Sequence, residues 1–249
     1  MRIIVCISNV PDTTTKVKFS SENTSFDDSG VQWIINPWDE LALTRAMELK
    51  EDASNAVSNV TVVTVGPAGA EPTLRKALAI GADDAIRVDS ETGDAHFVAA
   101  QLVSVIKNGE FDVILCGIES SDYNGSAVGG MVSEMLDIPS VSAISGLRID
   151  NEEVLITRDI DGGREEVSVP APFVGVVQKG IAKEPRIAAM RGIMMARKKP
   201  LQVVPVVEAE KLTTYQEYAM PEPKAPCKMI EADNVKELVN LLQNEAKVL

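Results

Sequence analysis

The feature that most limits the possible folds is a repeated alternation between short apolar runs and helix-like segments. Four runs, at residues 2–7, 59–65, 84–88 and 113–116, are short and almost wholly apolar. Such runs are typical of strands that are covered on both faces of a sheet. A helical pattern of apolar residues follows each of them along the chain. The alternation therefore predicts a doubly wound, mostly parallel α/β sheet over roughly residues 1–145.

The first three predicted helices have recognisable ends. The first helix begins at Asn36 or Asp39, both of which suit an N-cap, and it ends near Lys50. The second ends at Gly81, which suits the residue after a helix because glycine adopts left-handed backbone angles. The third spans residues 94–107.

Two regions depart from this alternation. Residues 16–35 alternate weakly, which predicts a hairpin or an irregular excursion. From residue 147, short alternating runs predict a β-meander over about residues 147–177, with turns at Asp150-Asn151 and Asp161-Gly162-Gly163. The last run of the meander is residues 173–177. We expect these strands to extend the sheet antiparallel at one edge or to lie beside it.

Composition excludes several classes of protein. The net charge is −13 and only 4% of the residues are aromatic, whereas nucleic acids are bound by basic faces and by stacked aromatic rings. We therefore expect no nucleic-acid partner. No apolar segment has the length of a membrane span or a signal peptide, so we expect a cytoplasmic protein without membrane insertion. The three cysteines, Cys6, Cys116 and Cys227, are far apart, which favours a reducing compartment.

The chain is poorly equipped for catalysis. Its single histidine, His96, lies in a predicted helix, where a lone histidine is more often a surface residue or a satisfied core residue than a catalyst. Without it, no Ser–His or Cys–His nucleophilic set can be assembled. No cluster has the spacing of metal ligands. We therefore expect neither catalytic residues nor a bound metal.

The most informative loop follows the fourth apolar run, at residues 117–128. It is rich in Gly, Ser, Asn and Asp, and in a parallel sheet it lies at the carboxyl end of a strand, where ligands bind. Small residues let the backbone approach a phosphate, and the helix that follows, which stops before Pro139, offers unpaired N–H groups. The loop matches neither the P-loop nor the dinucleotide fingerprint. A nucleotide phosphate site and an ordinary polar connection both remain open.

A second informative segment is residues 183–200, which is rich in Met and carries six of the chain's 24 Lys and Arg residues. Met side chains repack easily and basic rims attract acidic partners, so the segment suits an adaptable partner surface. A core-packed helix with solvated cations is the alternative. Further on, residues 220–226 are proline-rich, and Asp233 caps a last amphipathic helix. This arm lies against a partner chain or folds back on its own core.

Four stretches resemble the beta (small) subunits of the electron transfer flavoprotein family. They are VPDT at residues 10–13, INPWDELALTRAMELKE from Ile35, VTVGPAGAEPTLRKALAIGADDAIRV at residues 63–88, and KEPRIAAMRGIMMARKKP at residues 183–200. The resemblance covers nearly the whole chain. It implies a Rossmann-like, adenine nucleotide alpha hydrolase-like domain over residues 1–207, which includes a recognition loop at 183–200. It also implies that residues 208–249 form an extended arm and a helix that pack on an alpha subunit.

The resemblance further implies an electron carrier rather than an enzyme. Such heterodimers accept electrons from acyl-CoA dehydrogenases and related flavoenzymes in fatty acid oxidation. They pass these electrons to a quinone reductase or another acceptor. FAD is shared with the alpha subunit, which holds most of it, and the beta subunit carries AMP in most members.

The resemblance also places the site residues. The nucleotide pocket would use Cys6, Asn36, Pro37, Trp38, Asp39, Val65, Gly66, Gly117, Ser121, Asp122, Asn124, Gly125, Ser126, Ala127 and Val128. The partner-docking loop would use Arg186, Met190, Arg191, Met194, Arg197 and Lys198. Met190 stands in the place of the aliphatic anchor that enters a hydrophobic pocket on the dehydrogenase.

Two departures from the family pattern bear on the nucleotide. Relatives that hold a second FAD commonly carry QAIDGDTAQVGP, whereas Gly125 and Ala127 replace the Thr and Gln positions here. Residues 7–9, often VKQ or VKR, are Ile-Ser-Asn. We therefore expect AMP rather than a second FAD. A bifurcating subunit with a second FAD remains one alternative, and a stand-alone protein that binds or hydrolyses adenine nucleotides remains another.

Overall fold

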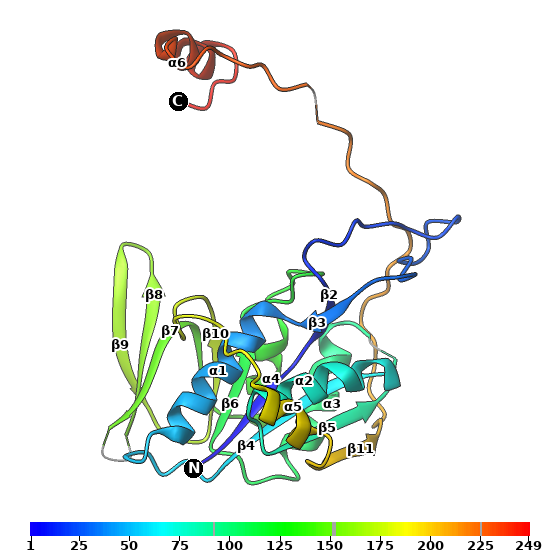
Figure 1. Ribbon diagram of the computed structural model, residues 1–249, viewed down its shortest axis with the longest axis vertical. Coiled ribbons are helices and arrows are strands. Elements are labelled where there is room, and N and C mark those ends of the chain that lie inside the picture. The colour runs from blue at the N-terminus through cyan, green and yellow to red at the C-terminus, as the bar shows by residue number, and fades with distance from the viewer. Residues whose placement is uncertain (92, 151–152, 225) are drawn as a thin grey trace.

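The computed structural model of the protein describes residues 1–249 except 92, 151–152 and 225. Its centre is a sheet of nine described strands in the order β11-β5-β4-β1-β6-β10-β7-β8-β9, with helices on both faces (Figure 1). A small second sheet pairs β2 with β3 antiparallel. The strands are β1 (Arg2–Cys6), β2 (Asn9–Pro11), β3 (Trp33–Ile35), β4 (Asn59–Gly66), β5 (Asp84–Asp89), β6 (Val113–Gly117), β7 (Ser140–Asp150), β8 (Glu153–Ile160), β9 (Gly163–Val169), β10 (Phe173–Val177) and β11 (Leu201–Pro205). The helices are α1 (Pro37–Glu51), α2 (Glu71–Ile80), α3 (Ala95–Ile106), α4 (Val128–Leu136), α5 (Met190–Ala196) and α6 (Val235–Asn244), with a 3-10 turn, η1, at Ala68–Ala70.

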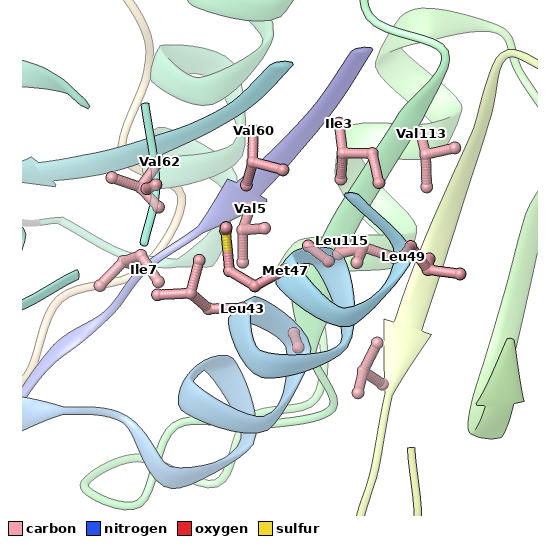
Figure 2. Packing of buried hydrophobic residues seen from close by; sticks show 14 of the residues in the cluster. Ile3, Val5, Ile7, Leu43, Met47, Leu49, Val60, Val62, Val113 and Leu115 are labelled. Carbon is pink, nitrogen blue, oxygen red and sulfur yellow. The ribbon is translucent and has the colours of Figure 1, made fainter. Parts of the chain in front are cut away.

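The predicted parallel α/β arrangement is confirmed, and alternate side chains of each central strand enter different core layers. Ile3 and Val5 of β1 belong to the cluster that α1 and α2 cover, which Figure 2 shows around Leu43 and Met47. Ile4 and Cys6 of the same strand face the opposite layer, under α3 and α4. Both sides of the central strands are therefore buried, as their continuous apolar runs require.

The strand predicted at residues 173–177 is present, but its predicted antiparallel place at the edge of the sheet is wrong. Instead of joining the edge antiparallel, β10 lies inside the sheet between β6 and β7 and is parallel to both. All five of its residues are buried, including Phe173 and Val174 at 0% exposure. A strand that is apolar on both faces can bury both of them when it lies inside a sheet whose two sides are covered by other elements. The parallel sheet therefore continues well beyond residue 145.

The antiparallel part is smaller than predicted and lies at one edge. β7 is one continuous strand that pairs parallel with β10 and antiparallel with β8, and β8 pairs antiparallel with β9. The turn at Asp161-Gly162-Gly163 joins β8 to β9, and Gly162 has a φ of 86°, which favours glycine. The predicted turn at Asp150-Asn151 lies partly outside the described residues. At the other edge, β11 pairs parallel with β5.

Element ends agree with the sequence pattern except at the last helix. Asn36 is the N-cap position of α1, and Asp94 caps α3 by accepting a hydrogen bond from the Phe97 N–H at 2.9 Å. Asn234, not Asp233, caps α6, since its side chain accepts from the Glu237 N–H. Residues 16–35 form an irregular excursion with an isolated bridge between Phe19 and Phe26, and they end in β3.

The chain after β11 leaves the body as an extended arm. The described residues between β11 and α6 contain no helix or strand. Figure 1 shows α6 well away from the sheet and its helices, and none of its residues is buried. Val235 and Leu238 on this helix are 59% and 43% exposed. The chain on its own therefore leaves an apolar helix face without a covering surface.

Candidate functional site

The carboxyl ends of three central strands meet at the point where the order of strands in the sheet reverses. β1 is flanked by β4 on one side and β6 on the other, and the chain reaches β6 only after building β4 and β5. Ligands of open α/β sheets bind outside the carboxyl ends of strands at such a switch point. The structure thus brings together the carboxyl ends of β1, β4 and β6, at Cys6, Gly66 and Gly117.

Asp39 connects two of these strand ends. Its side chain is 3% exposed, and its carboxylate accepts the Ser8 N–H at 2.8 Å and the Gly117 N–H at 2.9 Å. Burial in an apolar environment raises its pKa to about 7, although both hydrogen bonds favour the ionised form. A Cβ at Gly117 would lie 2.3 Å from Asp39 Oδ1, so the close approach requires glycine.

Asn36 positions the loop after β6. Its Nδ2 donates to the Glu119 carbonyl at 2.8 Å, and its Oδ1 accepts the Ser121 N–H at 3.2 Å. This use of the side chain explains why Asn36, although it occupies the N-cap position, makes no capping hydrogen bond to α1. Pro37 is the first residue of α1, and Trp38 lines a cavity of about 610 Å³ beside Glu119. The INPWDE run therefore shapes the loop by side-chain contacts.

The loop from β6 to α4 presents main-chain groups and small polar side chains. Asn124 and Ser126 have φ values of 50° and 47°, and Asp122 through Ser126 are exposed. α4 begins at Val128 after Ala127, whose side chain makes no capping hydrogen bond. Residues 7–12, 66–70 and 117–128 contain no Lys or Arg. An anion bound at these strand ends would therefore depend on backbone N–H groups and on the positive end of the α4 helix dipole.

Two predicted pocket residues turn their side chains into the core. Cys6 is 7% exposed and lies with Cys116 in the layer under α3 and α4. A hydrogen bond with Cys116 and burial raise the pKa of the Cys6 thiol well above its usual value. Val65 packs against the same layer. Only the backbone of these two residues lies at the strand ends in question.

Sequence reasoning missed a buried arginine beside the carboxyl end of β4. Arg87, on β5, is 4% exposed, and its Nη1 donates to the Gly66 carbonyl at 2.9 Å and to Asp89 Oδ1 at 2.5 Å. Its Nε lies 3.3 Å from Glu71 Oε1. A charged residue inside the apolar run DAIRV was the available signal. Two carboxylates compensate its single positive charge, and its hydrogen bond to the Gly66 carbonyl fixes the end of β4.

An aromatic cluster that sequence reasoning did not predict joins the arm to the β6–α4 loop. The ring centroids of Tyr123 and Tyr215 are 5.2 Å apart, and Tyr218 stacks on Phe19 at 5.1 Å. The Tyr218 N–H also donates to the Asn23 carbonyl at 2.8 Å. Partial burial raises the pKa of Tyr123 above its usual value. The first part of the arm is thus tied to the body near the candidate site.

The Met-rich segment forms a short helix on the surface. Met190 and Met194 of α5 are 74% and 67% exposed, and Ala196 is the one buried residue of α5. This exposure agrees with a partner surface and not with a core-packed helix. Arg191, Arg197 and Lys198 are exposed as well, whereas Arg186 pairs with Glu51 at 2.7 Å.

The part of the chain that the structure describes offers neither a membrane-spanning helix nor a metal-binding cluster. None of the helices in that part of the chain is long and apolar enough to cross a membrane. No group of three or more His, Cys, Asp and Glu side chains in the same residues is arranged to hold a metal ion. His96 Nδ1 lies 3.0 Å from the Glu210 carbonyl, so its ring contacts the arm.

Comparison with known proteins assigns the family. A family model described as an electron transfer flavoprotein domain matches residues 23–209. The electron transfer flavoprotein subunit beta of Bacillus subtilis (strain 168) is 34% identical over 264 aligned positions that cover 100% of both chains. The chain belongs to the electron transfer flavoprotein family. Membership confirms the predicted resemblance and an electron-transfer role that involves a flavin.

Other relatives agree with membership in the electron transfer flavoprotein family. The subunit beta of Syntrophomonas wolfei is 33% identical over 254 positions, which cover 100% of this chain and 98% of the relative. The acryloyl-CoA reductase electron transfer subunit gamma of Anaerotignum propionicum is 33% identical over 210 positions, which cover 82% of this chain and 77% of the relative. The α/β fold class predicted from the sequence is consistent with the electron transfer flavoprotein fold.

Proposed function

We propose that this chain is the beta subunit of a heterodimeric electron transfer flavoprotein. It pairs with an alpha subunit, accepts electrons from acyl-CoA dehydrogenase-type flavoenzymes and passes them to a quinone reductase or another acceptor. FAD, held mainly by the alpha subunit, supplies the redox chemistry. The end-to-end similarity to named beta subunits carries this proposal. The similarity to an acryloyl-CoA reductase electron transfer subunit supports a partner that acts on an acyl-CoA compound.

For the strand-end crevice we propose one bound AMP. Nothing lies within 4 Å of a Cβ placed at Gly125, and small residues surround it in the β6–α4 loop, so a nucleotide can approach the backbone there. Asn36 and Asp39 hold the crevice walls, and the N-terminus of α4 faces the same loop. Phosphate oxygens would accept hydrogen bonds from backbone N–H groups of residues 125–128, without a basic side chain.

The experiment is to co-express the chain with an alpha-type subunit and to extract and chromatograph every bound nucleotide. We expect one AMP and one FAD per heterodimer. Two FAD molecules after mild purification would overturn the AMP proposal and support a bifurcating subunit. ATP turnover by the purified chain alone would instead support the stand-alone nucleotide-hydrolysing alternative.

For the exposed surface of α5 we propose that Met190 anchors the electron-donating dehydrogenase. Its side chain is 74% exposed and lies between Arg186 and Arg191 in the sequence, so an apolar tip belongs to a basic segment. Met190→Ala removes a side chain worth roughly 1.5–3 kcal/mol when fully buried, and docking affinity should fall about ten- to a hundred-fold. Dehydrogenase-driven flavin reduction at matched flavin occupancy measures this. Equal rates at sub-saturating dehydrogenase would contradict the assignment.

A further inference from the structure

Two basic side chains cross between α2 and α5 in opposite directions. Lys199, just after α5, points its Nζ at the carboxyl end of α2 and donates to the Leu78, Gly81 and Ala82 carbonyls at 3.0, 2.9 and 2.5 Å. Arg75, on α2, donates from Nη1 to the Ala196 and Lys199 carbonyls, both at 2.8 Å. Each side chain supplies donors to the carbonyls that the end of the other helix leaves unpaired.

The backbones of the two helices also touch. A Cβ at Gly192 would lie 2.3 Å from the Ala79 carbonyl oxygen. Ala196, the last residue of α5, is 3% exposed, so one side of its carboxyl end is covered. α5 therefore lies flat on α2, and this contact directs Met190 and Met194 away from the body.

α5 needs such external support. It has seven residues and no side-chain N-cap, and a helix of this length is unstable alone in water. Its amino-terminal side is held separately, because the Arg186 N–H donates to Thr44 Oγ1 at 2.9 Å and Arg186 Nη1 pairs with Glu51. Arg75 and Lys199 hold the other side. Between them lies a groove of about 820 Å³ lined by Pro72, Ala79, Ile187 and Ile193, among others.

Lys199 differs from the adjacent Lys198 despite the shared charge. Lys198 is exposed, whereas Lys199 is partly buried and burial lowers its pKa. Three carbonyls surround its ammonium group. From sequence both lysines belong to one basic run, yet only Lys198 is available to attract an acidic partner.

We propose that Arg75, Lys199 and Gly192 are positioning residues, which hold the docking surface of α5 in place; Gly192 does so because it has no side chain. They hold α5 in the orientation that presents Met190, so that a partner does not have to order the helix on binding. This inference rests on the proposed docking function of α5. None of the three touches the partner; they act through the helix.

The test uses the heterodimer with its dehydrogenase and measures kcat, the apparent KM for the dehydrogenase, and hydrogen exchange of the α5 amides. The variants are Arg75→Met, Lys199→Met and Gly192→Ala, with Lys198→Met as the matched charge control. We expect the first three to raise KM by roughly tenfold with kcat unchanged and to speed exchange in α5. Lys199→Arg keeps a donor in place and should restore most of the affinity.

Salt separates the positioning effect from simple charge loss. The KM effect of Lys198→Met should fade as ionic strength rises, because exposed charges are screened, whereas that of Lys199→Met should persist. Gly192→Ala changes no charge and improves intrinsic helix propensity, so a role limited to helix stability would strengthen docking. We expect weaker docking, since the new Cβ pushes α5 off α2.

The outcomes distinguish this inference from the proposed function on which it rests. If Met190→Ala weakens docking while Arg75→Met, Lys199→Met and Gly192→Ala leave KM unchanged, positioning is overturned and the docking assignment stands. Loss of the Lys199→Met effect at high salt also overturns it. If Met190→Ala has no effect either, the docking assignment itself fails. Should Lys199→Met not assemble, Arg75→Met and Gly192→Ala decide the question.

Discussion

At the scale of single residues, Asp39 is the side chain on which most of the candidate site depends. It is buried, ionisable and bonded to the backbone of two strand ends, at Ser8 and Gly117. A carboxylate that loses its hydration is costly unless hydrogen bonds compensate. Two backbone N–H groups do so only in part, since the pKa of Asp39 remains raised to about 7.

This raised pKa gives a pH prediction. The folded protein keeps the Asp39 proton up to about pH 7, whereas an unfolded chain releases it near pH 4. Between these values the folded state binds more protons, so the Asp39 contribution to the free energy of unfolding falls as pH rises, by at most about 4 kcal/mol. Denaturant unfolding of wild type and Asp39→Asn at pH 4.5 and 7.5 measures it. The variant should lose less stability over this range, and equal pH dependence would contradict the assignment.

Gly117 carries the second residue-scale prediction. In Gly117→Ala the new Cβ would lie 2.3 Å from Asp39 Oδ1 and 2.9 Å from Trp38 Cβ. Because neither neighbour can move without losing its contacts, we expect a loss of roughly 1–3 kcal/mol in unfolding free energy and a lower bound-nucleotide content. Gly163→Ala is the matched control, since nothing lies within 4 Å of a Cβ there and Gly163 belongs to β9, the last strand at the other side of the sheet. Similar losses in both variants would show that the strand-end contact is unimportant.

At the scale of elements, α3 holds the first part of the arm against the body. Gln101 is 0% exposed; its Nε2 donates to the Val207 carbonyl at 2.9 Å, and its Oε1 accepts the Val207 N–H at 2.8 Å. Asp94 accepts the Leu212 and Thr213 N–H groups at 2.6 and 2.7 Å. The arm is therefore anchored before it reaches the aromatic cluster.

Gln101→Leu tests this anchor. The substitution leaves both main-chain groups of Val207 without their partner, and we expect hydrogen exchange of the Val207 amide to accelerate at least tenfold. Ser104→Ala on the same helix is the control, because among the described residues the Ser104 hydroxyl bonds within α3, to the Gln101 carbonyl. Unchanged exchange at Val207 in Gln101→Leu would mean that the arm is held by its other contacts alone.

At the scale of the whole molecule, the separation between α6 and the body suggests where a partner binds. The described chain offers α6 no surface, and its apolar residues remain exposed. An amphipathic helix of ten residues gains stability mainly by packing its apolar face. The alpha subunit is the occupant that the proposed function provides.

Deleting residues 221–249 should therefore reduce heterodimer formation, measured by co-purification with an alpha-type subunit. Leu238→Glu should weaken assembly in the same direction, because Leu238 lies on the apolar side of α6. Asn240→Glu adds the same charge at a polar position and serves as the control. Unchanged assembly after the deletion would contradict the role of the arm.

The amino-acid sequence by itself determined the strand–helix alternation and the presence of a basic, Met-rich segment. These features follow from local periodicity, which reports whether one or two faces of an element are covered. The family could also be identified from the sequence, because each motif that carries the resemblance is one continuous stretch of the chain.

Only the tertiary structure decided where β10 enters the sheet, what Asn36 and Asp39 bond, and which way Lys199 turns. Asp39 meets Gly117 across 78 positions of the chain, and Lys199 meets Leu78 across 121. No local pattern encodes such pairs, because each depends on how several elements pack together. Lys198 and Lys199 illustrate the limit: side by side in sequence and equal in charge, they differ because one faces solvent and the other faces the carboxyl end of α2.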